Sequence, residues 1–154
     1  MEILISYDHD KEDLEALPLV ELSRFVLEHE GKSEETEVSI SFVSDESIAA
    51  LNKKYRSKDE PTDVLSFECD SCDGDDFPSG DVSHYALGDV IIAPDVAKRQ
   101  TIEYGTSFEE EISLLLVHGL LHLCGYDHIE EEEAERMESL ESELLGSWTK
   151  IRMS

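Results

Sequence analysis

Three histidines within one eleven-residue segment, HGLLHLCGYDH, constrain the fold of this chain more than any other feature. His118 and His122 are four residues apart in an apolar stretch, so a helix there projects both rings from one face. Gly125 can adopt the left-handed conformation that ends a helix. The chain can then turn back and bring His128 to the same point. The spacing therefore predicts a helix, a tight turn and a returning segment.

Three converging imidazoles are typical of a site for zinc or another borderline divalent ion. A closed structural site would need a fourth ligand, but Cys124 lies about 200° around the helix from His122 and should point away. We therefore expect one ion per chain on His118, His122 and His128, with water in an open position. The simpler alternative, ordinary histidines at the rim of a core, suits the histidines without such spacing: His9, His29 and His84.

The spacing also matches the H-E-x-x-H-x-x-G-x-x-H pattern of metzincin proteases, with one chemical difference. Position 119 is glycine, so the carboxylate that serves those proteases as general base is missing. Three neutral ligands leave the ion its full charge and lower the pKa of bound water toward ~7. The resulting hydroxide could attack phosphorus, or the metal could polarise a phosphoryl oxygen.

A second segment, residues 52–67 (NKKYRSKDEPTDVLSF), gathers four of the twelve basic residues: Lys53, Lys54, Arg56 and Lys58. Over the whole chain acidic residues dominate, with 38 Asp+Glu and a net charge of −26. That charge opposes non-specific binding to nucleic acid or anionic membranes. The basic cluster still allows a phosphate to bind locally, with Arg56 able to make a bidentate contact. Cations that stabilise a helix C-terminus are an equally good interpretation.

The remaining pattern predicts one domain, residues 1–154, of the α/β class. Alternating or continuous apolar residues predict strands at 1–7, 37–43, 62–67 and 87–93. Helical spacing predicts helices at 18–29, 44–55, 94–104, 107–125 and 130–145. We expect a small mixed sheet of about four strands flanked by helices.

Local sequence signals predict where several of the helices begin. Ser44 is a plausible N-cap, Pro94 suits a first turn, and Ser107 with Glu110 matches a capping box. Asp, Gly and Ser predict an exposed acidic loop at residues 69–83.

Cysteine content and hydropathy indicate a reducing, cytoplasmic setting. Cys69 and Cys72 form an isolated pair in the acidic loop, and three cysteines do not make a disulfide framework. We expect no role for this pair. No apolar run reaches the ~20 residues that cross a bilayer, and MEILISYDHD is unlike a secretory signal.

HGLLHLCGYDH resembles the signature H-G-x-L-H-L-x-G-Y-D-H of the YbeY family, bacterial metal-dependent endoribonucleases acting in ribosomal RNA maturation. YRSKDEPTDVLSF and LGDVII resemble the second and third blocks of that family. Order and spacing agree from about Val38 to Leu140, two-thirds of the chain. The chain departs from the family at Ser57, where glycine is usual, and at Glu68, where proline is usual.

The resemblance implies a metzincin-like core, with zinc on His118, His122 and His128. It implies that Arg56 is the functional arginine of a substrate channel. We predict Arg56 and His118 as catalytic residues, and expect RNA contacts from Lys53, Lys54, Arg56 and Lys58. The implied substrate is single-stranded RNA, in 16S rRNA 3′-end maturation and ribosome quality control. The implied partners are the small ribosomal subunit and its assembly factors.

Two alternatives remain at this point. One is a metallohydrolase acting on a peptide or ester, and the other is a ribosome-assembly factor in which zinc is mainly structural. No general base is evident. Asp63 and Asp89 lie in the matching blocks, although turn or cap aspartates are the preferred interpretation. Tyr126 and Asp127 are expected to shape the metal-binding loop rather than react.

Overall fold

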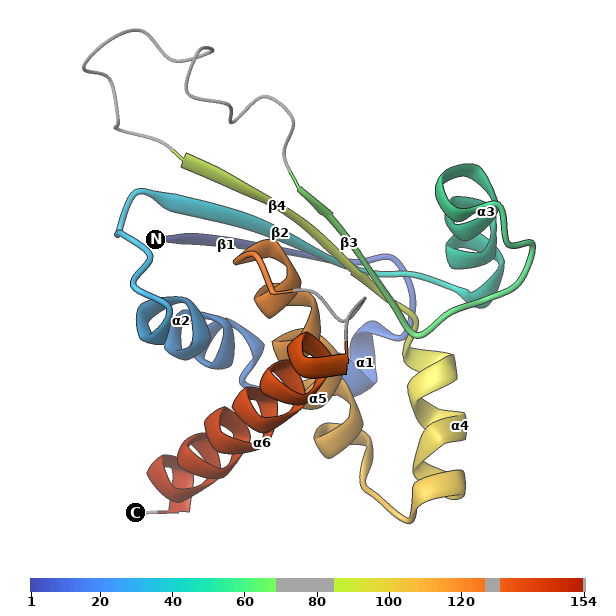
Figure 1. Ribbon diagram of the computed structural model, residues 1–154. Coiled ribbons are helices and arrows are strands. Elements are labelled where there is room, and N and C mark those ends of the chain that lie inside the picture. The colour runs from blue at the N-terminus through green and yellow to red at the C-terminus, as the bar shows by residue number, and fades with distance from the viewer. Residues whose placement is uncertain (69–84, 127–130, 154) are drawn as a thin grey trace, which may run out of the picture.

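The computed structural model describes residues 1–68, 85–126 and 131–153, and Figure 1 shows how its elements are arranged. The strands are β1 (Glu2–Tyr7), β2 (Thr36–Phe42), β3 (Val64–Glu68) and β4 (Tyr85–Ile92). The helices are α1 (Lys11–Leu14), α2 (Leu19–His29), α3 (Asp45–Arg56), α4 (Pro94–Tyr104), α5 (Phe108–Leu123) and α6 (Glu131–Met153).

The four strands form one mixed sheet in the order β1-β2-β4-β3. β1 pairs with β2, and β2 with β4, in parallel, whereas β3 runs antiparallel to β4. This confirms the predicted mixed sheet flanked by helices. β3 pairs with β4, the next strand along the chain, and forms one edge of the sheet.

The sheet buries its two faces against different helices. Ile40 and Val90 belong to the main core, which includes residues of α2, α5 and α6. Figure 1 shows these helices on one side of the sheet, with α3 set apart from them. Side chains alternate along a strand, so Leu65 points the other way and packs with Ile48 of α3. β3 therefore lies between α5 on one face and α3 on the other.

The predicted starts of α3, α4 and α5 and the predicted turn after α5 are confirmed. Ser44 Oγ accepts a hydrogen bond from the Ser47 backbone N–H at 3.2 Å. Ser107 and Glu110 form both bonds of the capping box, and Pro94 begins α4. Gly125 has a φ of 105°, so the turn after α5 is built on the expected positive φ.

Two elements differ from the sequence expectation. The last helix continues to Met153 instead of ending near Leu145. Trp148 packs on the core and its ring lies 5.6 Å from that of Phe25, and this burial outweighs the ~1 kcal/mol cost of Gly146 in a helix. The short helix α1 was not predicted, because its segment is polar apart from the fully buried Leu14.

Several predicted features lie outside the described residues: the acidic loop with Cys69 and Cys72, His84, Asp127 and His128. Positions of the remaining candidate residues follow below.

Candidate functional site

A cleft of about 1180 Å³, here called the edge cleft, runs along β3. Helix α3 contributes one wall and helix α5, on the other face of the sheet, contributes another. Its lining residues are Leu51, Tyr55, Arg56, residues 62–68, Asp89, Ile91, His118, His122, Leu123, Gly125 and Tyr126. The edge position of β3 is what allows residues from both faces to share one cleft.

His118 and His122 meet in this cleft. They are one turn apart on α5, their rings lie edge to face with centroids 4.6 Å apart, and their Nε2 atoms are 3.1 Å apart. Two nitrogens that bind one zinc ion at ~2.0–2.1 Å in tetrahedral geometry stand ~3.3 Å apart. The pair therefore fits two ligands of a single ion, as the spacing of four residues predicts.

The other ring nitrogen of His118 faces a buried carboxylate. Nδ1 of His118 is hydrogen-bonded to Oε1 of Glu141, which is 7% exposed and comes from α6. With the proton on Nδ1, the lone pair of Nε2 is directed into the cleft. Sequence reasoning missed Glu141 among the many glutamates of α6. The sequence signal for Glu141 was its helical spacing from Met137 and Leu144, which places an acidic residue on the face of α6 that packs on the core.

Packing explains why position 119 is glycine. A Cβ atom there would lie 2.6 Å from Cγ1 of Val90, so no larger side chain fits where α5 crosses the sheet. Ser66 Oγ also donates a hydrogen bond to the Gly119 carbonyl at 3.1 Å. The general base of the metzincin pattern is therefore excluded sterically as well as missing from the sequence.

Arg56 enters the same cleft from the opposite wall. It is the last residue of α3, and Ser57 ends the helix in the left-handed conformation with φ 60° and ψ 27°. The usual glycine of the YbeY family at this position would adopt that conformation without strain. The structure thus brings Arg56 and the histidine pair to one cavity, although they are far apart in sequence.

The three lysines of the basic cluster lie outside the residues that line the edge cleft. Lys53, Lys54 and Lys58 are all exposed. Lys53 Nζ lies 3.8 Å from a carboxylate oxygen of Asp59, and Lys54 Nζ lies 5.1 Å from the ring centroid of Tyr55. Of the four basic residues in this segment, Arg56 is the one that lines the cleft.

The two candidate aspartates differ in their surroundings. Asp63 Oδ1 accepts from the Val64 backbone N–H at 2.8 Å, and Oδ2 accepts from Gln100 Nε2 at 3.2 Å. These bonds support a turn-forming role for Asp63. Asp89 is exposed on β4 and lines the cleft.

Two residues after α5 take structural positions. Cys124 is half-buried against the main core, burial raises the pKa of its thiol to about 11, and it is not among the cleft-lining residues. Tyr126 does line the cleft, and a hydrogen bond with Glu30 raises the pKa of its hydroxyl. Glu30 directly follows α2, so this bond links the segment after α5 to the end of α2. The role of Tyr126 in shaping a metal-binding loop stays a prediction.

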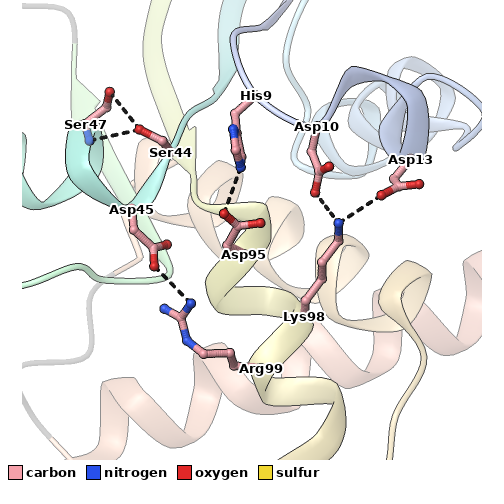
Figure 2. Close-up of polar contacts among 9 residues, drawn as sticks. All are labelled: His9, Asp10, Asp13, Ser44, Asp45, Ser47, Asp95, Lys98 and Arg99. Atoms are coloured by element: carbon pink, nitrogen blue, oxygen red, sulfur yellow. Dashed lines mark hydrogen bonds and ion pairs between the residues drawn. The ribbon is translucent and has the colours of Figure 1, made fainter.

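A second polar group lies away from the edge cleft and could hold a metal ion (Figure 2). His9 Nε2 is 2.8 Å from Asp95 Oδ2, and Asp10 is beside them. No partner of His9 could be predicted from the sequence, because Asp95 is distant along the chain. Lys98 forms ion pairs with Asp10 and Asp13, and these bonds raise the pKa of its ammonium. The group therefore already contains a cation.

Comparison with known proteins places this arrangement in a family. The model of the family "Endoribonuclease YbeY" matches residues 5–149. An Endoribonuclease YbeY of Macrococcus caseolyticus is 42% identical over 95% of this chain and 96% of its own. The Bacillus subtilis protein of the same name is 43% identical over 82% of each chain. A solution structure from Thermotoga maritima superimposes with a TM-score of 0.58 at 28% identity, covering 96% of this chain and 92% of that one.

The fold and the family match define a hydrolase that acts on RNA phosphodiester bonds. The chain belongs to the YbeY endoribonuclease family. In the described part of the structure, no helix is both long and apolar enough to cross a membrane.

Proposed function

We propose that the histidine end of the edge cleft is the metal centre of this endoribonuclease, within a single domain of residues 1–154. The observation that carries the proposal is the 3.1 Å approach of the His118 and His122 Nε2 atoms inside the cleft that also contains Arg56. One zinc ion, or another divalent metal, would be held by His118, His122 and His128. When bound, it supplies Lewis-acid charge and lowers the pKa of a bound water toward ~7.

The side chains around the centre have separate tasks. The carboxylate of Glu141 holds the His118 ring with Nε2 toward the cleft. The Arg56 guanidinium neutralises negative charge that develops on the phosphoryl oxygens. Lys53, Lys54 and Lys58 bind phosphates of the flanking RNA. Asp89 remains a candidate to accept a proton, because it is the exposed cleft aspartate of the two considered.

The proposed substrate is single-stranded ribosomal RNA, with 16S rRNA 3′-end maturation and ribosome quality control as the process. The partners would be the small ribosomal subunit and its assembly factors, in the cytoplasm. The support is the family match along nearly the whole chain. A peptidase is disfavoured by the packing at Gly119. An assembly factor with a structural zinc is disfavoured by the open cleft beside the histidines.

The test is metal analysis of the purified protein joined to cleavage of a single-stranded ribosomal RNA fragment. We expect about one divalent ion per chain, loss of cleavage with chelator and recovery on metal addition. His118→Ala, His122→Ala and His128→Ala should each lose metal and cleavage.

Two control variants separate this centre from other histidines. His29→Ala removes an exposed histidine outside the cleft, and His9→Ala removes the histidine of the second polar group. Both should keep the metal and the cleavage rate. Loss of the metal in His9→Ala alone would move the metal centre to the Asp10–Asp95 group and overturn the proposal.

A further inference from the structure

An aromatic pair lies in the edge cleft beside Arg56. Tyr55, the preceding residue of α3, lines the cleft and is 56% exposed. The ring of Phe67, from β3, lies 4.9 Å away at an interplanar angle of 57°. Phe67 packs against the smaller core with Leu65 and Ile48. The Phe67 ring, which packs against the smaller core, thus supports the exposed ring of Tyr55.

An uncharged aromatic contact to RNA is more important in this chain because the chain is strongly acidic. The net charge of −26 weakens the long-range attraction of RNA to this protein. In most nucleic-acid-binding proteins, basic side chains that contact phosphates supply a large part of the affinity. Every base, by contrast, has an apolar face that stacks on an aromatic ring independently of net charge. Local contacts inside the cleft therefore have to supply much of the affinity.

We propose that Tyr55, supported by Phe67, is a stacking platform for one nucleobase of the RNA, adjacent to the phosphate that Arg56 contacts. This inference rests on the proposed function, because it requires RNA in the edge cleft. A base in a duplex is stacked on its neighbours and paired, so a platform of this kind accepts only an unpaired nucleotide. The ammonium of the exposed Lys54 lies over the Tyr55 ring, 5.1 Å from its centroid, so it has to leave that face when a base stacks there and can then bind the flanking phosphate.

The probe is a short fluorescent single-stranded RNA, compared with a set in which one abasic ribose is moved along the strand. Binding is measured by anisotropy with chelator present, so that cleavage does not interfere. An abasic site removes a base but leaves the phosphates, and so separates stacking from backbone contacts. For the wild-type protein, one position in the strand should weaken binding about 10- to 100-fold when it is abasic.

The variants test whether that position is the one on Tyr55. Tyr55→Leu keeps an apolar side chain against Phe67 but removes the ring, and Tyr55→Trp keeps a ring. Tyr55→Leu should lose the same 10- to 100-fold on intact RNA and show no further loss with the abasic strand. Tyr55→Trp should bind as the wild type does. Tyr104→Ala is the matched control, because Tyr104 is 62% exposed at the end of α4 and outside the cleft lining.

Two results would overturn the platform. One is a wild-type protein that binds all abasic strands as tightly as intact RNA. The other is Tyr55→Leu that binds intact RNA normally or stays as sensitive to the abasic site as the wild type. Melting curves confirm that each variant is folded. Failure of the proposed metal centre would appear separately, as His118→Ala and His122→Ala variants that keep the metal and the cleavage while the abasic effect persists.

Discussion

Nδ1 of His118 on α5 is hydrogen-bonded to Oε1 of Glu141 on α6. The carboxylate is almost fully buried, and burying a charge is costly unless it is well paired. A buried glutamate is therefore retained here in spite of its cost to folding. Orienting a metal-binding imidazole is a function that would account for it.

Replacing Glu141 should weaken metal binding without removing a direct ligand. We expect Glu141→Ala to lower zinc affinity about 10- to 100-fold, because His118 loses the acceptor that fixes its tautomer. Glu141→Gln, which keeps an acceptor oxygen, should lose less. Competition with a calibrated chelator measures both. Glu138→Gln, an exposed substitution on the same helix, is the control, and an unchanged affinity in Glu141→Ala would refute the orienting role.

Arg56 should act on the reaction and not on the fold. Arg56→Ala is expected to reduce the cleavage rate about 10²- to 10³-fold, because a charge-assisted contact to the phosphoryl group is lost. Arg56→Lys should also be impaired, because a point charge cannot reproduce the planar fork. Cleavage assays beside melting curves test this, with Arg136→Ala on the exposed face of α6 as control. Undiminished cleavage in Arg56→Ala would show that Arg56 acts only as a charge at the end of α3.

Ser57→Gly should stabilise the protein. Ser57 has a φ of 60°, a conformation that costs a residue with a Cβ atom more than it costs glycine. We expect the free energy of unfolding to rise by about 0.5–1 kcal/mol, measured by denaturant titration. Ser139 is an exposed residue in the middle of α6. Ser139→Gly should lower the free energy of unfolding by about 0.5 kcal/mol. Equal signs in the two variants would argue against strain at Ser57.

Gly119→Ala should destabilise the protein although alanine favours helices. Its Cβ would lie 2.6 Å from Val90 and 3.3 Å from Ser66, so strand and helix must separate. We expect a loss of about 1–3 kcal/mol in the free energy of unfolding. Gly146→Ala is the matched control, because nothing lies within 4 Å of its Cβ position and it should gain about 0.5–1 kcal/mol. A stable Gly119→Ala protein would show that the crossing can relax.

Cys124 should be a poorly reactive thiol. Its pKa of about 11 leaves it almost wholly protonated at neutral pH, and only the thiolate is alkylated readily. In a protein carrying Cys69→Ser and Cys72→Ser, which we expect to keep its metal, alkylation should be slow at pH 7. It should speed up about tenfold per pH unit until the pH approaches 11. Rapid alkylation at pH 7, followed by mass spectrometry, would contradict this.

Features that depend on neighbours within about one helical turn could be predicted from the amino-acid sequence. The spacing of His118 and His122 put both rings on one face of α5, and Ser44, Ser107 and Gly125 set helix ends. Alternation predicted the strand at 37–43, and a continuous apolar run predicted the one at 87–93. These signals involve residues only a few positions apart, so they can be read without knowing the tertiary structure.

Contacts between residues that are distant along the chain became known from the three-dimensional fold. The strand order left β3 at the sheet edge, so that Arg56 and Tyr55 share a cleft with the histidine pair. Glu141 reaches His118 from another helix. His9 and Asp95 meet because β1 and β4 run in the same direction and both residues follow the carboxyl ends of these strands. Such contacts depend on how apolar faces pack against one another, and many pairings of the same elements are compatible with one hydrophobic pattern.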